Sequence, residues 1–294
     1  MKSLRKVVVL CLIIVGLSVF AAGFGLFANE GKGEYNFTSI HGETVQIYGR
    51  GLYSQDSVSM ASQARAQDGV TLFLGIPLLI ASVLLTVKGS FKGRLMLTGT
   101  LGYFLYTYAS YCFLAMYNSM FLVYVGLFSA SFYAFILTMA SFDGRRLDEY
   151  FKESLPAKSI GAFLWFIGFV IAMMWLGKII NPLINNSTPE GLEHYTTLTI
   201  QAMDLAIIVP LAVITGYMVM LRRPYGYLLA SVVIIKGVSL LTSITAMLIA
   251  MFAAGVKVSP AEAVIFPVFN IGIILCFIVL LKNVKEPSNK ETLF

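Results

Sequence analysis

Eight long apolar stretches dominate this sequence and restrict what the chain can fold into. They cover residues 7–27, 69–87, 95–116, 119–141, 160–180, 204–221, 226–252 and 262–281. A helix needs about 20 apolar residues to cross the hydrocarbon core of a bilayer, and it bonds all its backbone polar groups internally. Only 12% of the residues are charged, against about 25% in soluble domains. We therefore predict an all-α, polytopic membrane protein, an eight-helix transmembrane bundle that forms one domain over residues 1–294.

The basic residues predict the orientation of the bundle, because cytoplasmic loops carry an excess of Lys and Arg. Fifteen of the 21 lie at the two ends of the chain or after the second, fourth and sixth stretches. These fifteen are Lys2, Arg5, Lys6, Lys88, Lys92, Arg94, Arg145, Arg146, Lys152, Lys158, Arg222, Arg223, Lys282, Lys285 and Lys290. We predict cytoplasmic N- and C-termini and a multi-pass protein of the cytoplasmic membrane. The same asymmetry accounts for the net charge of +6 without a nucleic-acid partner.

Two long outer loops, residues 28–68 and 182–203, contain the only histidines, His41 and His194. The first loop includes TVQIYG, whose alternation predicts a short strand, and then small residues that predict a helix leading into the second stretch. Neither histidine has the HExxH spacing of a zinc site, so we predict exposed polar residues, with no metal and no cofactor. GxSxG, Walker A and GxGxxG motifs are absent from the sequence. An enzyme is not favoured, although an intramembrane or extracytoplasmic enzyme stays open.

The two halves of the chain, residues 1–141 and 160–281, repeat one pattern of spans and loops. The second stretch of each half opens similarly, with QARAQDGVTLFLGIPLL in the first and IQAMDLAIIVPLAV in the second. Four spans per half would give two parallel repeats. Aligning Arg94 with Arg223 pairs Thr107 with Lys236. The alternative, that any eight-span chain divides into two groups of four, stays open.

One lysine, Lys236, interrupts the apolar run ASVVIIKGVSLL. It lies 13 residues beyond Arg223, which places it about 20 Å into the membrane at 1.5 Å per residue. The same counting places Asn270 at nearly this depth and Asp204 about 7 Å further out. A charged residue at this depth marks a functional site or an ion pair.

The predicted binding residues follow from these depths. Ser239 and Ser243 share the face of Lys236, and Gln201 shares that of Asp204. The complete set is Lys236, Asp204, Asn270, Ser239, Ser243, Thr107 and Gln201. In the third stretch, GYFLYTYASYCF places Tyr103 and Tyr106 on one face, which predicts packing inside the bundle.

Two segments, LGYFLYTYASYCFLAMYNSMFLVYVGLFSASFYAFIL and RRPYGYLLASVVIIKGVSLL, carry a resemblance. They are similar to a family of prokaryotic polytopic integral membrane proteins of about eight spans. The resemblance implies an integral membrane protein and implies no activity or site residue.

We interpret the chain as a secondary transporter or ion-coupled permease, whose partners are the lipid bilayer and a small solute or ion. The alternative is a non-catalytic scaffold or sensor, in which Lys236 and Asp204 form a structural pair and the outer loops bind a partner. A sealed Lys236 in dry packing would favour this alternative.

Overall fold

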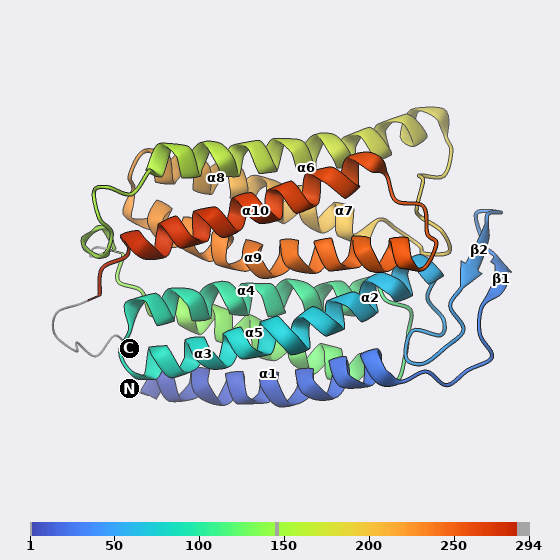
Figure 1. Cartoon of the computed structure of the whole chain (residues 1–294), viewed down its shortest axis with the longest axis horizontal. Coiled ribbons are helices and arrows are strands. Elements are labelled where there is room, and N and C mark those ends of the chain that lie inside the picture. The colour runs from blue at the N-terminus through green and yellow to red at the C-terminus, as the bar shows by residue number, and fades with distance from the viewer. Residues whose placement is uncertain (1, 145–146, 287–294) are drawn as a thin grey trace.

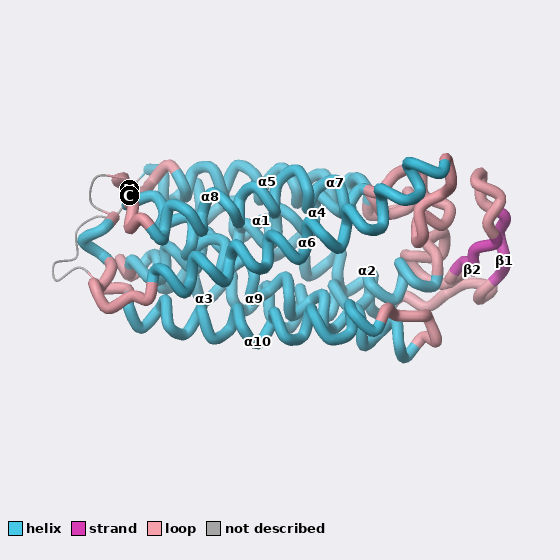
Figure 2. Tube along the Cα trace, turned by 90° about the horizontal axis from the view of Figure 1, so that it is seen from above, coloured by secondary structure: helices cyan, strands magenta, loops and turns pink. Residues whose placement is uncertain are grey.

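The computed structural model describes residues 2–144 and 147–286, and its helices run side by side along one long axis (Figures 1 and 2). The α-helices are α1 (Lys2–Phe27), α2 (Val58–Val70), α3 (Ile76–Val87), α4 (Phe91–Phe113), α5 (Phe121–Met139), α6 (Ala157–Asn185), α7 (Thr199–Met203), α8 (Val209–Met220), α9 (Pro224–Ala253) and α10 (Pro260–Asn283). Shorter elements are β1 (Tyr35–Thr38), β2 (Thr44–Ile47), the π-helical turns η1 (Thr71–Gly75) and η3 (Asp204–Ile208), and the 3-10 turn η2 (Asp148–Tyr150). The start of α1 and the end of α10 lie at one end of the bundle, and β1 and β2 lie at the other. We name these the terminal end and the hairpin end.

Seven helical stretches within the described residues are long and apolar enough to cross a membrane. They are Leu4–Phe27, Val58–Val87, Phe121–Met139, Ala157–Asn185, Thr199–Met220, Pro224–Ala253 and Pro260–Asn283. These seven confirm seven of the predicted stretches and an all-α, multi-pass membrane protein. The remaining stretch, residues 95–116, forms α4, which is not among the seven. Threonines and tyrosines lower its hydropathy, and most of its side chains are buried against α3, α5 and α9.

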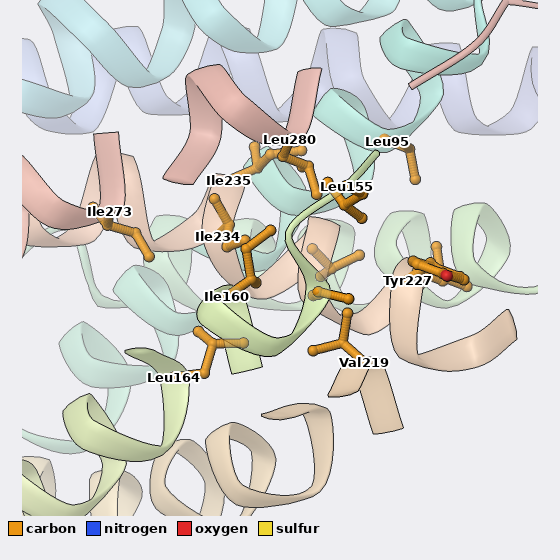
Figure 3. Close-up of a cluster of buried hydrophobic side chains, with 14 of the residues drawn as sticks. Leu95, Leu155, Ile160, Leu164, Val219, Tyr227, Ile234, Ile235, Ile273 and Leu280 are labelled. Atoms are coloured by element: carbon orange, nitrogen blue, oxygen red, sulfur yellow. The ribbon is translucent and has the colours of Figure 1, made fainter. Parts of the chain in front are cut away.

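The bundle consists of two halves, α1–α5 and α6–α10, which meet where α9 packs against α4 and α2 (Figure 1). One hydrophobic core lies in the first half, and its fully buried side chains include Ile14, Leu79 and Leu101. The second core lies among α6, α8, α9 and α10. Figure 3 shows this second core, where Leu155, from the loop before α6, packs beside helix residues such as Leu95. The second core therefore extends across the boundary between the halves to the start of α4.

Each half contains one helix in which a π-helical turn ends two residues before a proline. The turn η1 precedes Pro77 and the turn η3 precedes Pro210. Proline has no N–H to donate to the carbonyl one turn earlier, and a π-helical turn accommodates the resulting gap in the hydrogen-bond pattern. The Pro-Leu pair that both halves contain is thus associated with a π-helical turn in each half.

The two halves match at one constant offset in residue number. The same offset relates the starts of η1 and η3 (Thr71 and Asp204), of α3 and α8 (Ile76 and Val209), and of α4 and α9 (Phe91 and Pro224). The connecting turns also match at this offset, since Gly89 has φ 83° and Arg222 has φ 51°.

Two glycines just after these turns confirm the same register. A Cβ on Gly93 would lie 2.5 Å from Leu85 Cβ, and a Cβ on Gly226 would lie 2.5 Å from the Met218 carbonyl carbon. Gly93 and Gly226 are related by the constant offset, as are Leu85 and Met218. This offset differs by one helical turn from the sequence alignment of Arg94 with Arg223.

At the constant offset, Tyr103 and not Thr107 corresponds to Lys236. Arginine is a poor marker of register because any basic residue serves equally well at a cytoplasmic loop. The turns and close helix contacts determine the register instead.

The two long loops contact each other at the hairpin end. His41 Nε2 lies 3.3 Å from the Tyr195 carbonyl oxygen, and His194 Nε2 lies 3.0 Å from the Gln55 carbonyl oxygen. The predicted strand is present, because β2 pairs with β1 in an antiparallel hairpin. The predicted helix before the second stretch is also present as α2. His41 is exposed as predicted, whereas His194 is half-buried at the contact between the loops.

Asp56 is the most buried carboxylate of this contact, with 1% of its surface exposed. Its Oδ1 accepts hydrogen bonds from the Tyr195 hydroxyl at 2.9 Å and from the Met116 N–H at 3.1 Å. Burial raises the pKa of Asp56 to about 6, although both donors and the nearby His194 act in the opposite direction. The loop contact therefore encloses a group that titrates near neutral pH.

At the terminal end, the segment after α10 caps α4. The Glu286 carboxylate accepts hydrogen bonds from the Ser90 hydroxyl at 2.7 Å and from the backbone N–H groups of Phe91 at 2.7 Å and Lys92 at 3.2 Å. A carboxylate at this position satisfies free N–H groups and interacts favourably with the helix dipole. This contact connects the end of the second half to the central helix of the first.

Candidate functional site

Four side chains from both halves, one of them a tyrosine at the centre, meet at one place in the bundle. The Tyr106 hydroxyl, from α4, donates to Asp204 Oδ1 at 2.6 Å. The Trp175 indole N–H, from α6, donates to Asp204 Oδ2 at 2.9 Å. Lys236 Nζ, from α9, lies 4.2 Å from the centroid of the Tyr106 ring. We call this group, Tyr106, Trp175, Asp204 and Lys236, the Tyr106 site.

The local sequence positions each member of this site. Asp204 is the first residue of η3, so the carboxylate projects where the helix departs from regular α geometry. Lys236 lies near the middle of α9, which runs without interruption from Pro224 to Ala253. Tyr106 belongs to α4, the helix that packs on α9 and α7. The site therefore forms where a broken helix meets continuous ones.

The expected direct pair between Lys236 and Asp204 is not formed. Within the described residues, no carboxylate oxygen lies within 4.0 Å of Lys236 Nζ. The Tyr106 side chain explains the separation, because the lysine faces its ring while the aspartate accepts from its hydroxyl. Lys236 and Asp204 therefore both contact Tyr106 without contacting each other.

The Lys236 ammonium has no hydrogen-bond acceptor among the residues that the structure describes. An ammonium carries three donors, so all three are available. Lys236, Tyr106, Asp204 and Trp175 each keep part of their surface accessible.

The polar chemistry of the Tyr106 site is divided between its two sides. Asp204 already accepts one hydrogen bond on each oxygen, but an ionised carboxylate offers about four lone-pair positions. Lys236 offers donors, and the ring faces of Tyr106 and Trp175 attract cations. The site can thus bind a negative group at one side and a positive group at the other.

An ion pair lies next to the site, towards the hairpin end. Lys178 Nζ forms a 2.7 Å salt bridge with Glu262 Oε1, which joins α6 to α10. The same ammonium lies 5.4 Å from the Trp175 ring. Trp175 therefore connects this pair to Asp204.

The other predicted binding residues lie outside the Tyr106 site. Asn270 exchanges hydrogen bonds with Thr242 at 3.2 Å and Thr245 at 3.5 Å, so it joins α10 to α9. Gln201 is half-buried one turn before Asp204 and has no hydrogen-bonded side-chain partner in the described part of the chain. Equal depth in the sequence count did not bring Asn270 to Lys236, because its side chain bonds α9 at a different interface.

Ser239, Ser243 and Thr107 are buried around Tyr103 and its neighbours. The Ser239 hydroxyl is buried without a partner among the described residues. Ser243 donates to the Ser239 carbonyl oxygen at 3.0 Å and lies 3.4 Å from the Tyr103 hydroxyl. Gln67 Nε2 donates to Thr107 Oγ1 at 3.2 Å. Ser243 and Thr107 therefore belong to a second polar cluster, and Ser239 lies one turn before Ser243 on α9.

That second cluster occupies the positions of the first half that match Asp204 and Lys236. Thr71 and Tyr103 correspond to them at the constant offset, and their hydroxyl oxygens are 3.0 Å apart. Gln67 Nε2 also donates to the Tyr103 hydroxyl at 2.6 Å. All three side chains are buried, with at most 3% exposed. The matched positions are neutral, directly bonded and sealed in one half, and charged, separated and partly accessible in the other.

Asp68 is a further buried carboxylate in the first half. It accepts hydrogen bonds from Tyr53 at 2.6 Å and Tyr111 at 3.1 Å, and only 2% of it is exposed. A Cβ on Gly25 would lie 2.0 Å from its Oδ2. Asp68 is therefore enclosed among tyrosines and leaves no room for a ligand.

Sequence reasoning missed Trp175 as a member of the site and assigned Tyr106 only to interior packing. A useful signal was the indole N–H of Trp175, since a tryptophan within a long apolar helix needs an acceptor for its N–H. Asp204 was the nearest candidate acceptor by depth. No group of three or more His, Cys, Asp or Glu residues suited to a metal occurs in the described residues.

Comparison with protein-family models, with curated proteins and with solved structures found no match. The functional argument therefore depends on the geometry of this chain.

Proposed function

We propose that this protein is a secondary transporter of a small polar solute, with its binding site at Tyr106, Trp175, Asp204 and Lys236. The observation that carries the proposal is the unpartnered ammonium of the partly accessible Lys236, which faces the same ring as the bonded Asp204. A lysine kept only to fix helix register would gain most from a direct, enclosed pair. Such a lysine in a membrane span is otherwise costly.

The proposed topology has eight spans with both termini in the cytoplasm. It adds α4 to the seven apolar stretches, because α4 is long enough at 23 residues and lies within the bundle, where hydroxyl groups such as those of Thr98, Tyr103 and Tyr111 have protein partners. The basic residues near the terminal end support a cytoplasmic location for that end. The cytoplasmic membrane is the proposed location.

The proposed architecture is a pair of parallel four-helix repeats. The constant offset between matching helices, π-helical turns and connecting turns supports a duplication. Transporter sites lie between such repeats, often at interrupted helices. The Tyr106 site fits this position, since α4 belongs to one half and η3 and α9 belong to the other.

Transport can be tested with purified protein in proteoliposomes. The vesicles would receive a defined mixture of amino acids, organic acids, sugars, nucleosides and inorganic ions, and mass spectrometry would measure uptake. We expect saturable uptake of at least one solute, which Lys236→Met and Asp204→Asn each reduce at least tenfold. Thr71→Val, at the matched sealed position, is the control and should retain uptake.

Two results would contradict transport. One is uptake by Lys236→Met and Asp204→Asn at wild-type rates, while both variants elute and melt like the wild type. The other is the absence of protein-dependent uptake for every solute in the mixture.

A scaffold or sensor is the second candidate, and the hairpin favours it. The strand β1 is fully exposed and presents Tyr35 and Phe37, and Ile40 follows in the connecting turn with 79% of its surface exposed. A partner protein could bind these side chains. In that case, replacing Lys236 and Asp204 together by apolar residues would leave partner binding intact, whereas Ile40→Ser would weaken it.

A further inference from the structure

We propose that the ligand of the Tyr106 site is zwitterionic, carrying an acidic group and an amino group on one small skeleton. This inference rests on the proposed function and adds the class of substrate. The acidic group would bind the Lys236 ammonium, and the amino group would bind Asp204 between Tyr106 and Trp175.

The first argument is the state of Lys236. The residue keeps accessible surface, and its ammonium has no acceptor within the described residues. Its ring contact with Tyr106, at 4.2 Å, compensates the charge only in part, because a cation–π contact is weaker than a pair with an anion. An anionic ligand group would supply charge-assisted hydrogen bonds to the three free donors.

The second argument is the state of Asp204. Tyr106 and Trp175 hold one oxygen each, which fixes the carboxylate in one orientation. Both donors are neutral, so they leave its negative charge uncompensated. A ligand that carried only a negative charge would bring that charge close to Asp204. A ligand with an additional ammonium would bind the remaining lone pairs and the adjacent aromatic faces.

The third argument is the separation of the two charges. It exceeds 4.0 Å, because no salt bridge forms, and the Tyr106 contacts limit it to at most about 10 Å. An α-amino acid has its nitrogen and carboxylate oxygens roughly 3 Å apart. With an ion pair of about 2.8 Å at each end, it spans a gap within this range.

The matched positions in the other half support the same assignment. There the Thr71 and Tyr103 hydroxyl oxygens are 3.0 Å apart, and both side chains are buried. The substitution of this neutral pair by Asp204 and Lys236 introduces two opposite charges and accessible surface together. Two opposite charges that are kept apart are the complement of a ligand with two opposite charges.

Ammonium and acidic groups occur together in free amino acids and also in phosphatidylethanolamine headgroups. The test therefore compares these two sources. Purified wild-type protein in detergent would be titrated with the twenty amino acids, and separately with short-chain phosphatidylethanolamine against short-chain phosphatidylcholine, while its thermal unfolding is followed. Phosphatidylcholine has a quaternary ammonium and cannot donate a hydrogen bond to Asp204.

The decisive comparison uses matched ligands that lack one charge. For alanine these are propionate, which lacks the amine, and ethylamine, which lacks the carboxylate; equivalent pairs exist for any other amino acid that binds. We expect the zwitterion to bind wild type at least tenfold more tightly than either analogue. Lys236→Gln should bind the amine as tightly as it binds the zwitterion. Asp204→Asn should bind the acid as tightly as it binds the zwitterion. Thr71→Val should keep the wild-type preference.

Different results overturn different claims. If propionate or another simple anion binds wild type as tightly as the zwitterion, and Lys236→Gln abolishes that binding, the zwitterionic class is wrong while a solute site at Lys236 stands. If no amino acid and no headgroup shifts unfolding, the zwitterionic class is also wrong. If, in addition, the proteoliposomes show no protein-dependent uptake of any solute, the proposed function fails as well. A response to phosphatidylethanolamine alone would assign the site to a lipid headgroup.

Discussion

Asp56 provides the sharpest quantitative prediction, because it titrates outside the membrane-spanning helices. It lies in the contact between the two loops, 1% exposed, with hydrogen bonds from Tyr195 and Met116 to one oxygen. Replacing Asp56 by Asn keeps an oxygen acceptor in place and removes the charge. We therefore expect Asp56→Asn to stabilise the loop contact at neutral pH.

The magnitude follows from the pKa of Asp56. Burial raises this pKa from 3.8 to about 6, and each unit corresponds to 1.36 kcal/mol. Because the folded-state pKa is the higher one, protonation stabilises the fold: the contribution is complete below pH 3.8 and is lost as the pH rises through about 6. Over the whole range the effect is about 3 kcal/mol.

Hydrogen exchange in the loops measures this effect directly. Between pH 7.5 and pH 5, one unit below the folded-state pKa, the wild-type contact should gain about 1.4 kcal/mol. Backbone exchange in residues 28–57, corrected for the intrinsic rate, should therefore slow about tenfold at pH 5. In Asp56→Asn, the corrected rates should be low and nearly equal at both pH values.

The neighbouring charged groups require a control. Glu193 and His194 both act on Asp56 electrostatically, and burial raises the pKa of Glu193 as well. The comparison is therefore repeated in a His194→Gln background. There the part of the pH dependence of exchange that Asp56→Asn removes should persist. The reasoning is refuted if wild type and Asp56→Asn show the same pH dependence, or if Asp56→Asn exchanges faster than wild type at pH 7.5.

Three further predictions concern the packing of the bundle. Gly226→Ala should lower the melting temperature by an amount equivalent to about 1–3 kcal/mol, because its Cβ would lie 2.5 Å from the Met218 backbone. The control is Gly16→Ala, whose Cβ would have no atom within 4 Å and which should leave the melting temperature unchanged. Glu286→Gln should weaken the cap of α4 by about 0.5–1 kcal/mol, seen as faster hydrogen exchange in the first turn of α4. Tyr195→Phe removes a hydrogen bond worth about 1 kcal/mol and should accelerate exchange in the contacting loops about fivefold at neutral pH; unchanged exchange would show that the hydroxyl does not stabilise the contact.

The sequence was sufficient for the helical elements because apolar length is a local property. Seven spans, the strand β2 and the helix α2 could be recognised from residues that are adjacent in the chain. The orientation of the bundle and the eighth span stay predictions. The sequence alignment of the two halves differs by one helical turn from the offset between their helices, because that offset depends on turns such as that at Gly89 and on the close approach of Gly226 to α8.

The site could be predicted from the sequence only in part, because depth along a helix does not determine which way a side chain points. Lys236 and Asp204 do lie in one region, but Tyr106 separates them. Asn270 has nearly the same calculated depth as Lys236 and bonds Thr242 instead. Rotation about each helix axis decides such contacts, and it depends on the packing of the complete bundle.

The contacts at the two ends of the bundle have a mechanical consequence for any transport cycle. Tyr195 from the second half holds Asp56 of the first at the hairpin end, and Glu286 from the second half holds the start of α4 at the terminal end. The two contacts join the same two halves at opposite ends of the bundle. In a transporter built on this bundle, one contact would have to open while the other stays closed, so the loops and the segment after α10 would set the order of opening.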